Sequence, residues 1–458
     1  MADRSTIFAL SSGRPPAAIA VVRVSGSQAR IALERLIDRV PQPRKAALAR
    51  VHDPASGEAI DEALALWFPA PHSETGEDVA ELQLHGGQAV IAGVLKALAA
   101  IEDCRLAEPG EFTRRAFENG KLDLTAVEGL GDLIFAETPA QRRQAFRQLK
   151  GLIGDRAEAW RRRLIEALAL VEARIDFSDE ADVPEDLIAP AAEIARALRD
   201  EISVALADGH RGERLRDGIM VAILGPPNVG KSSILNRIAR RDAAITSAVP
   251  GTTRDVVEVA IDLDGYPVIL ADTAGLRETS DPIEQEGLRR ALSRAEEAEL
   301  RLYVFDATDP AQADGARAWP GPDTILVANK TDLLHRPLRN PSPASGGGQG
   351  GGERVEALPE GVTLVSALTG AGIADLLATL GERVAHNFQI EAPVLTRARH
   401  REALEDARGA LARASGAPLP ELRAEDLRLA MRSLGRITGA VDVEDLLDVI
   451  FRDFCIGK

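Results

Sequence analysis

Short, continuous runs of apolar residues mark the middle of the chain. They lie at residues 219–224, 268–271, 302–305 and 325–328. Residues 362–365 are expected to form a further strand. Runs of this length are typical of strands that are buried on both faces, as in a parallel sheet. Helical patterns lie between the runs, and this alternation predicts a doubly wound α/β domain. We place that domain at residues 216–383.

A different pattern, with most apolar residues three, four or seven positions apart, flanks this domain on both sides. Such spacing puts the residues on one stripe of an amphipathic helix. One such series of apolar residues predicts a single long helix; its members are Leu149, Ile153, Trp160, Leu164, Leu168, Val171 and Ile175. A second helix is expected at about residues 190–207. We predict one helical domain in two parts, residues 121–215 and 384–458, with the α/β domain inserted between them.

The first 120 residues predict a separate mixed α/β domain. Residues 18–24 are rich in β-branched side chains and residues 79–84 are similar, so both favour strands. Residues 89–101 favour a helix. The predicted fold class is therefore multidomain, with an N-terminal α/β domain, a discontinuous all-α domain and an inserted doubly wound domain.

The net charge of the chain and one local basic run bear on whether the protein binds nucleic acid. The chain carries a formal net charge of −16, which argues against a protein that merely coats nucleic acid, because phosphate binding needs clustered Lys and Arg. One basic run is a candidate RNA-binding patch, although we interpret it as a solvated helix face. The run comprises Arg142, Arg143, Arg147, Lys150, Arg156, Arg161, Arg162 and Arg163.

The cysteine content and the absence of long apolar runs bear on location. Cys104 and Cys455 are too few for a disulfide framework and fit a reducing compartment. No apolar run approaches the roughly 18 residues that a membrane span requires. We therefore expect a soluble cytoplasmic protein that does not enter a membrane. Both cysteines are interpreted as packing residues, with a reactive thiol as the alternative at Cys455.

The clearest chemical motif follows the first buried run. Residues 225–232, Gly-Pro-Pro-Asn-Val-Gly-Lys-Ser, fit the phosphate-binding pattern G-x-x-x-x-G-K-[ST] between a strand and a helix. Backbone amides of such a loop surround phosphates, the lysine reaches the outer phosphates and the serine hydroxyl binds Mg²⁺. The candidate nucleotide-binding residues of this segment are Asn228, Val229, Gly230, Lys231, Ser232 and Ser233.

Three further motifs occur in the order that a guanine-nucleotide site requires. Asp272 and Gly275 belong to an Asp-Thr-Ala-Gly segment that would hold the Mg²⁺ shell and contact the γ-phosphate. Asp332 can only accept hydrogen bonds, so its carboxylate selects guanine, which offers N1–H and an amine, over adenine. The candidate base-binding residues are Asn329, Lys330, Asp332, Ser366 and Ala367.

A switch segment is expected at residues 251–255, between the phosphate loop and Asp272. Thr253 is the first candidate for its Mg²⁺ ligand and Thr252 the second. Ras-like proteins orient the attacking water with a glutamine after Asp-x-x-Gly, whereas this chain has Leu276 there. Hydrolysis is then either very slow or supported by another group, for which Glu284 and Glu286 are candidates.

Further segments narrow the class of GTPase. The N-terminal third contains Thr-Gly-Glu-Asp-Val-Ala-Glu-Leu at residues 75–82, Glu-Pro-Gly-Glu-Phe-Thr at 108–113 and Asn-Gly-Lys-Leu-Asp-Leu at 119–124. The chain ends with Asp-Phe-Cys-Ile-Gly-Lys at residues 453–458. Together these segments closely resemble the MnmE (TrmE) family of tRNA-modification GTPases, over essentially the whole chain.

This resemblance implies a specific function. It implies a homodimer whose N-terminal domain, residues 1–120, binds a tetrahydrofolate derivative of the 5-formyl or methylene type. It also implies a flavin-containing partner, MnmG, and the addition of an aminomethyl or carboxymethylaminomethyl group to C5 of the wobble uridine of certain tRNAs. The G domain would be the inserted α/β domain.

The resemblance also implies individual site residues. In the family the GTPase is stimulated by K⁺, and Asn228, Ser247, Val249 and Thr252 match its K⁺-ligand positions, while Glu284 matches the glutamate that positions the water. Ser247 stands where the family usually has Thr, and Pro250 where it usually has Ala. The positions that match the folate site are Arg23, Glu81, Lys121 and Lys458.

Two alternatives remain from the motifs alone. A ribosome-assembly or other regulatory GTPase also suits the phosphate loop, although it would lack the N-terminal third and the Cys-Ile-Gly-Lys ending. A non-hydrolysing, nucleotide-gated scaffold is compatible with Leu276 but not with Glu284 and Asn228 in the roles given above.

Overall fold

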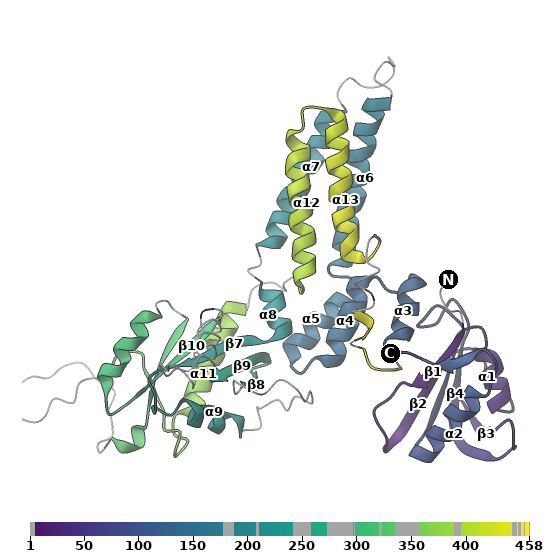
Figure 1. Cartoon of the computed structure of the whole chain (residues 1–458), viewed down its shortest axis with the longest axis horizontal. Coiled ribbons are helices and arrows are strands. Elements are labelled where there is room, and N and C mark those ends of the chain that lie inside the picture. The colour runs from purple at the N-terminus through teal and green to yellow at the C-terminus, as the bar shows by residue number, and fades with distance from the viewer. Residues whose placement is uncertain are drawn as a thin grey trace, which may run out of the picture. The chain divides into compact units, whose positions relative to one another are not determined.

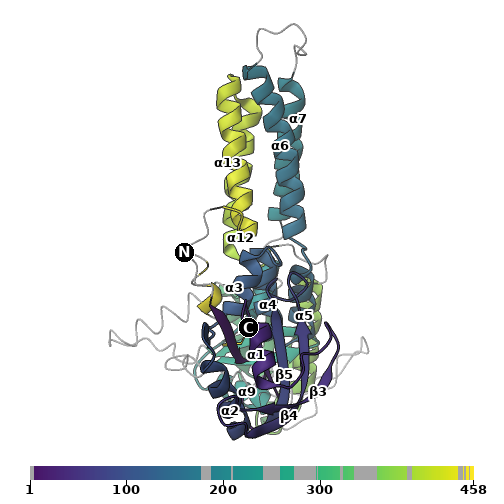
Figure 2. The same ribbon diagram turned by 90° about the vertical axis from the view of Figure 1, so that its right-hand side faces the viewer.

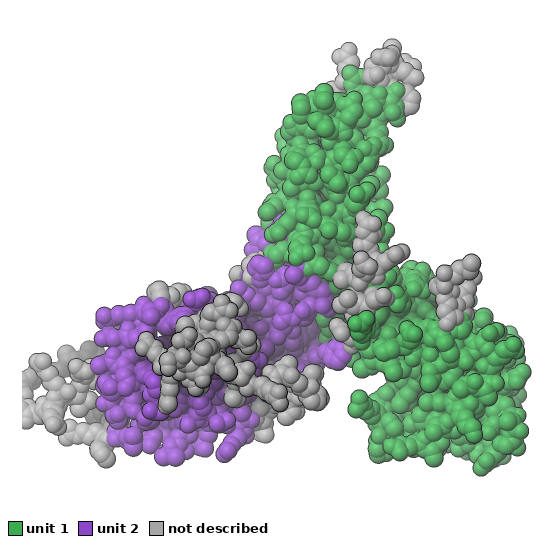
Figure 3. All heavy atoms as spheres, viewed as in Figure 1, with its two compact units in different colours: residues 1–134, 146–204, 399–458 green, residues 135–145, 205–398 purple. Residues whose placement is uncertain are grey.

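The computed structural model forms two compact units, which Figure 3 colours separately. The first unit comprises residues 1–134, 146–204 and 399–458, and the second comprises residues 135–145 and 205–398. Within them, the structure describes residues 5–176, 187–207, 210–240, 258–272, 296, 298–319, 323–334, 358–388, 395–441, 447, 450–452 and 454–457.

The N-terminal part of the first unit is built on a six-stranded sheet with the order β3-β4-β5-β2-β1-β6. Its neighbouring strands are antiparallel except for the parallel pair β1 and β6. The strands are β1 (Thr6–Leu10), β2 (Ala17–Ser25), β3 (Ala47–His52), β4 (Ala59–Phe68), β5 (Val79–Gly86) and β6 (Cys104–Leu106).

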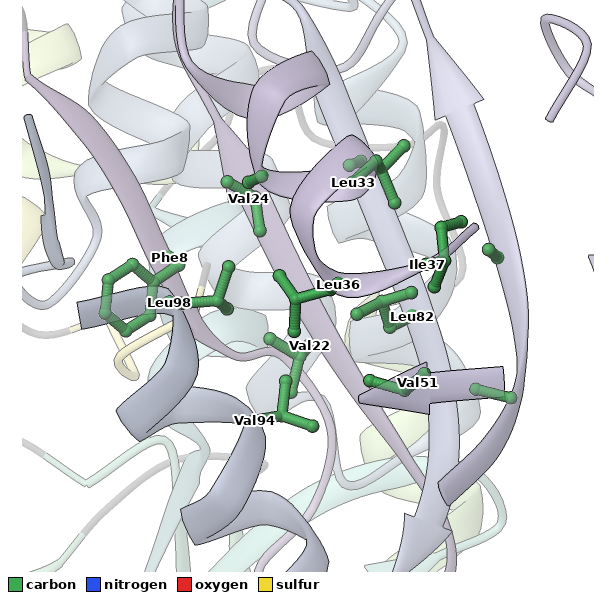
Figure 4. Packing of buried hydrophobic residues seen from close by; sticks show 14 of the residues in the cluster. Phe8, Val22, Val24, Leu33, Leu36, Ile37, Val51, Leu82, Val94 and Leu98 are labelled. Atoms are coloured by element: carbon green, nitrogen blue, oxygen red, sulfur yellow. The ribbon is translucent and has the colours of Figure 1, made fainter. Parts of the chain in front are cut away.

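Helices α1 (Ala29–Leu36) and α2 (Gln88–Ala99) cover one face of this sheet, as Figure 4 shows. Side chains alternate between the two faces of a strand, so Val22 and Val24 of β2 point to the same side and are buried there. Leu33 and Leu98 from the two helices complete the packing. Arg23, between the two valines, therefore lies on the opposite face, which positions it for a polar role.

Four long helices lie side by side in both ribbon views (Figures 1 and 2). They are α6 (Gly154–Asp176), α7 (Ile188–Leu206), α12 (Ala398–Gly416) and α13 (Pro420–Thr438). Trp160, Leu164 and Val171 of the predicted stripe are buried in α6. Shorter helices α3 (Glu111–Glu118) and α4 (Leu124–Phe135) belong to the same unit.

The prediction of one helix through Leu149 and Ile153 is wrong. Leu149 is the last residue of α5 (Pro139–Leu149), and Ile153 lies in the turn before α6. Gly151 has φ +94° in this turn, a conformation that ends a helix and that glycine adopts without strain. The apolar spacing continues across this turn because Leu149 before it is partly buried and Ile153 at its end is fully buried.

The second unit contains a doubly wound sheet with the order β12-β11-β10-β7-β9-β8, parallel except for the β8–β9 hairpin. Helices α9 and α11 pack on one face, while Tyr303 and Phe305 are buried on the other. The strands are β7 (Ile219–Leu224), β8 (Glu258–Leu263), β9 (Tyr266–Asp272), β10 (Leu300–Asp306), β11 (Thr324–Asn329) and β12 (Thr363–Leu364). The helices are α8 (Arg211–Asp217), α9 (Lys231–Ala239), α11 (Ile373–Phe388) and the 3₁₀ helices η1 (Pro310–Ala318) and η2 (Thr331–Leu333).

The predicted fold class is confirmed: an α/β N-terminal part, long helices from two chain segments and an inserted doubly wound sheet are all present. The four domain limits stay a prediction. In the part of the chain that the structure describes, no helix is long and apolar enough to cross a membrane.

Candidate functional site

The phosphate-binding loop joins β7 to α9 in the second unit, as the sequence predicts. β7 is the central strand, with β10 and β9 parallel on its two sides, so the loop lies at the carboxyl edge of the sheet, where open α/β sheets bind ligands. Gly225 has φ +134°, and a Cβ there would lie 1.9 Å from the Val304 carbonyl oxygen. Only glycine permits this close passage of the loop over β10.

Lys231 and Ser232 begin α9 directly after the loop. The Lys231 amine donates hydrogen bonds to the carbonyl oxygens of Gly225 (2.8 Å) and Pro226 (2.9 Å). Burial lowers the pKa of this amine, although the nearby Asp272 carboxylate raises it. The amine is thus desolvated and held against the loop, where it is positioned to bind a phosphate.

Ser232 and Asp272 come from different elements and meet at this edge. Asp272 ends β9 and is buried, and the Ser232 hydroxyl donates a hydrogen bond to its Oδ2. A hydroxyl and a carboxylate side by side are hard oxygen donors of the kind that Mg²⁺ prefers. The pair fits the predicted metal position.

The candidate base-binding residues lie together at the ends of β11 and β12. Asn329 is buried; its Nδ2 donates to the Val229 carbonyl oxygen (2.8 Å), and its Oδ1 accepts from the Ala367 amide (3.0 Å). The Ser366 hydroxyl donates to Asp332 Oδ1. Asn329 thus ties the phosphate loop to the base-binding segment, while Ser366 fixes the Asp332 carboxylate.

Asp306, at the end of β10, is a site residue that the sequence analysis did not identify, and it pairs with Lys330. The Lys330 amine lies 2.8 Å from Asp306 Oδ2. Burial alone raises the pKa of Asp306, but hydrogen bonds from Lys330 and Thr308 outweigh that effect, so the net shift is downward. Asp306 stays ionised and orients the Lys330 stem beside the site. An acidic residue at the carboxyl end of a buried apolar run is the sequence feature that could have identified Asp306 as a site residue.

Several candidate residues lie outside the described part of the chain. This holds for the predicted switch segment, for Leu276 and for one folate candidate. The candidate residues concerned are Ser247, Val249, Thr252, Thr253, Gly275, Glu284 and Lys458.

Two candidate folate residues meet on the face of the N-terminal sheet opposite α1 and α2. Arg23 of β2 stands opposite Glu81 of β5 in the strand register, and Arg23 Nε donates to Glu81 Oε1 (2.9 Å). Arg23 also pairs with Glu74, and its guanidinium carbon lies 5.7 Å from the centre of the Phe112 ring. The result is a charged, half-buried cluster beside an aromatic ring.

Lys121 reaches the segment before β5 that also carries Glu74. Its amine donates to the Pro71 carbonyl oxygen (2.8 Å). The same segment is fixed by Ser25, whose hydroxyl lies 2.7 Å from both Thr75 Oγ1 and Glu77 Oε2. Sequence reasoning singled out the Thr-Gly-Glu segment as a motif but not these anchoring contacts.

The C-terminal tail reaches the same N-terminal domain. Ile456 forms an isolated antiparallel bridge with Pro109, and a Cβ on Gly457 would lie 2.2 Å from the Leu10 carbonyl oxygen. Cys455 is exposed, so its interpretation as a packed hydrophobe is wrong. The tail therefore contacts the Glu-Pro-Gly segment, which lies between β6 and α3.

Known proteins match this chain over almost its whole length. Residues 6–121 match the N-terminus of the GTP-binding protein TrmE, and residues 124–455 match the MnmE helical domain. A tRNA modification GTPase MnmE of Rhodopseudomonas palustris (strain BisB18) is 55% identical, with 99% of each chain covered. The chain belongs to the MnmE family.

Other relatives agree. The MnmE of Parvibaculum lavamentivorans is 56% identical over 99% of this chain and 100% of its own, and that of Rhodospirillum rubrum is 52% identical over 99% of both. As a member of the MnmE family, the chain is a GTP hydrolase of tRNA modification. The alternatives of a ribosome-assembly GTPase and a non-hydrolysing scaffold are thereby set aside.

Proposed function

We propose that this MnmE-family protein is a potassium-stimulated GTPase that works with a flavin-dependent partner, MnmG. Together they would install an aminomethyl or carboxymethylaminomethyl group at C5 of the wobble uridine, U34, with the one-carbon unit taken from a tetrahydrofolate derivative. The observation that carries the proposal is the convergence of Lys231, Asp272 and Asp332 at one sheet edge, in a chain that matches MnmE relatives from end to end. Because tRNA is its substrate, the protein would act in the cytoplasm.

GTP and Mg²⁺ would be held by the residues of the second unit. Lys231 would bind the outer phosphates, and the adjacent Ser232 hydroxyl and Asp272 carboxylate fit Mg²⁺ directly or through water. Asp332, held by Ser366, would accept the two N–H donors of guanine. The metal would neutralise negative charge that develops on the phosphates.

K⁺ would be held in part by Asn228, which has φ +62° within the loop, together with Ser247, Val249 and Thr252. Oxygen ligands suit a hard cation, and K⁺ supplies positive charge where an arginine finger does so in other GTPases. Glu284 would position the attacking water, a role that Leu276 cannot perform. Two G domains would meet across their nucleotide faces in the homodimer.

A tetrahydrofolate derivative would bind the N-terminal domain. Carboxylates such as Glu81 accept the N–H donors that a pterin ring presents, and Arg23 holds Glu81 in place (2.9 Å). The amine of Lys121, and that of Lys458, would bind the acidic tail of the folate. The donor set therefore fits the group, with acceptors for the ring and cations for the tail.

The experiment that tests this proposal is steady-state GTP hydrolysis by the purified full-length protein, in KCl and in NaCl at equal ionic strength. We expect hydrolysis to be at least roughly tenfold faster in KCl, because K⁺ would stabilise the transition-state charge by more than about 1.4 kcal/mol. Equal, slow rates in the two salts would contradict the role given to K⁺ and to the paired G domains.

A further inference from the structure

The basic run between residues 142 and 163 separates into two helices with different electrostatic surroundings. On α6, Arg163 pairs with Glu201 (2.6 Å) and Arg161 with Glu158 (3.4 Å), while Arg156 lies over the ring of Trp160. Two of these three α6 cations pair with a carboxylate, and the third packs on an aromatic ring. They behave as the solvated helix face that the sequence predicts.

The first part of α5, residues 139–145, belongs to the second unit, where hydrogen bonds fix one of its faces. Gln144 Nε2 donates to the Gly212 carbonyl oxygen (3.0 Å) and Gln141 Nε2 to that of Arg216 (3.0 Å), both on α8 (Figure 1). The Ala140 amide donates to the Gly265 carbonyl oxygen (3.0 Å). The orientation of α5 about its own axis is therefore set, and its other face points to solvent.

That exposed face carries basic residues and one phenylalanine, and no acidic residue. Successive helical residues are turned by about 100°, so the exposed residues cover an arc of roughly 140°; they are Arg142, Arg143, Phe146, Arg147 and Lys150. Among the residues that the structure describes, no carboxylate pairs with these three arginines. Residues 139–150 contain no Asp or Glu, in a chain of net charge −16. The arrangement leaves four cations and a 51% exposed phenylalanine on about 12 Å of helix.

We propose that this α5 face, defined by Arg142, Arg143, Phe146, Arg147 and Lys150, binds the sugar–phosphate backbone and a base of the tRNA substrate. Arginine presents a planar fork of donors that matches phosphate oxygens, and the exposed Phe146 ring offers a surface on which an unpaired base stacks. The inference rests on the proposed function, because that function supplies the RNA.

Two other partners fit this face less well. A membrane-surface helix needs a broad apolar face in addition to basic residues, and the inner face of α5 is already occupied by Gln141, Gln144 and Ala145. An acidic protein would be attracted by the charges but would leave the exposed Phe146 ring, with Lys150 5.5 Å above its centre, without a specific role. RNA uses both features.

The test is the affinity of the full-length protein for an unmodified tRNA transcript, measured at several salt concentrations. The variant is Arg143→Gln/Arg147→Gln. The matched control is Arg413→Gln/Arg428→Gln, which removes the same charge from arginines paired with Asp426 and Glu172 on the long helices. We expect the α5 variant to bind tRNA at least about tenfold more weakly and to reduce the slope of log K against log salt by about 1.5. The control should bind within about twofold of the native protein.

GTP binding serves as the check on folding, since the α5 variant should bind GTP normally. Equal tRNA binding by the α5 variant and the native protein would overturn this inference while leaving the proposed function standing. Loss of binding to the flavin partner, with tRNA binding unchanged, would also overturn it. A native protein that binds no tRNA would count against the proposed function itself.

Discussion

Lys231→Ala is expected to lower the affinity for GTP by roughly 100-fold or more. The Lys231 amine is buried and is held at the phosphate loop by the carbonyl oxygens of Gly225 and Pro226. Removal of one member of a buried, hydrogen-bonded charge pair costs about 2–5 kcal/mol, and about 2.7 kcal/mol corresponds to 100-fold in Kd. Titration with a fluorescent GTP analogue measures the effect.

The matched control for this substitution is Arg237→Ala on the same helix. Arg237 is half-buried and donates to the Thr369 carbonyl oxygen (2.7 Å), away from the phosphate loop. Its removal should leave the affinity for GTP within about threefold of the native value. Comparable losses in the two variants would mean that α9 had been disturbed generally, and the role of Lys231 would then lack support.

The second large effect is expected on stability, at a buried ionic cluster in the first unit. Glu128 of α4 is 2% exposed; its carboxylate accepts hydrogen bonds from Arg399 Nε (2.6 Å) and Nη2 (2.7 Å), and it also contacts His400 Nε2 (3.0 Å). Arg399 further donates to the carbonyl oxygens of Arg436 and Ile437 at the end of α13. This cluster therefore joins α4, α12 and α13.

Glu128→Gln should lower the free energy of unfolding by about 3–5 kcal/mol, because a buried cation loses its counter-ion while it stays desolvated. The corresponding fall in Tm is roughly 10 °C for the unit. Thermal and urea unfolding followed by circular dichroism measure it. Glu172→Gln, which removes an exposed partner of Arg428 on the same bundle, should cost less than about 1 kcal/mol.

The effect should also depend on pH. Burial alone raises the pKa of Glu128, but the hydrogen bonds and charges of His400 and Arg399 lower it by a larger amount. The net result is a pKa of about 2, against an ordinary value of 4.5. A carboxyl whose folded pKa is depressed stabilises the fold above its unfolded pKa, and this contribution is lost as the pH falls from 4.5 toward 2. The difference between native protein and Glu128→Gln should therefore shrink by about half between pH 7 and pH 3. A constant difference would contradict this origin of the stabilisation.

Regular patterns and short motifs proved the most predictable parts of the molecule. The run at residues 219–224 coincides with β7, and the phosphate loop lies between β7 and α9. These features are local: a buried parallel strand needs continuous apolar side chains, and the loop needs glycine where a Cβ would strike β10. Sequence spacing alone therefore specifies them.

Contacts between distant segments could not be predicted. The partners Glu128 and Arg399 are 271 residues apart, and neither carries a local signal of burial. The break between α5 and α6 was missed because apolar residues line both sides of Gly151. On α6, Arg161 and Arg163 of the basic run have acidic partners. The absence of described acidic partners on α5 depends on which residues the fold brings near that helix, and the sequence pattern does not show this.

The central claim is that the protein serves modification of the wobble uridine, and nucleoside analysis of tRNA tests it most directly. Total tRNA would be prepared from cells that lack the protein and carry either the native gene or the Lys231→Ala variant, then digested and examined by mass spectrometry. The account predicts aminomethyl or carboxymethylaminomethyl groups at C5 with the native gene, and wobble uridine without them in the variant. Full modification in cells without the protein would contradict it.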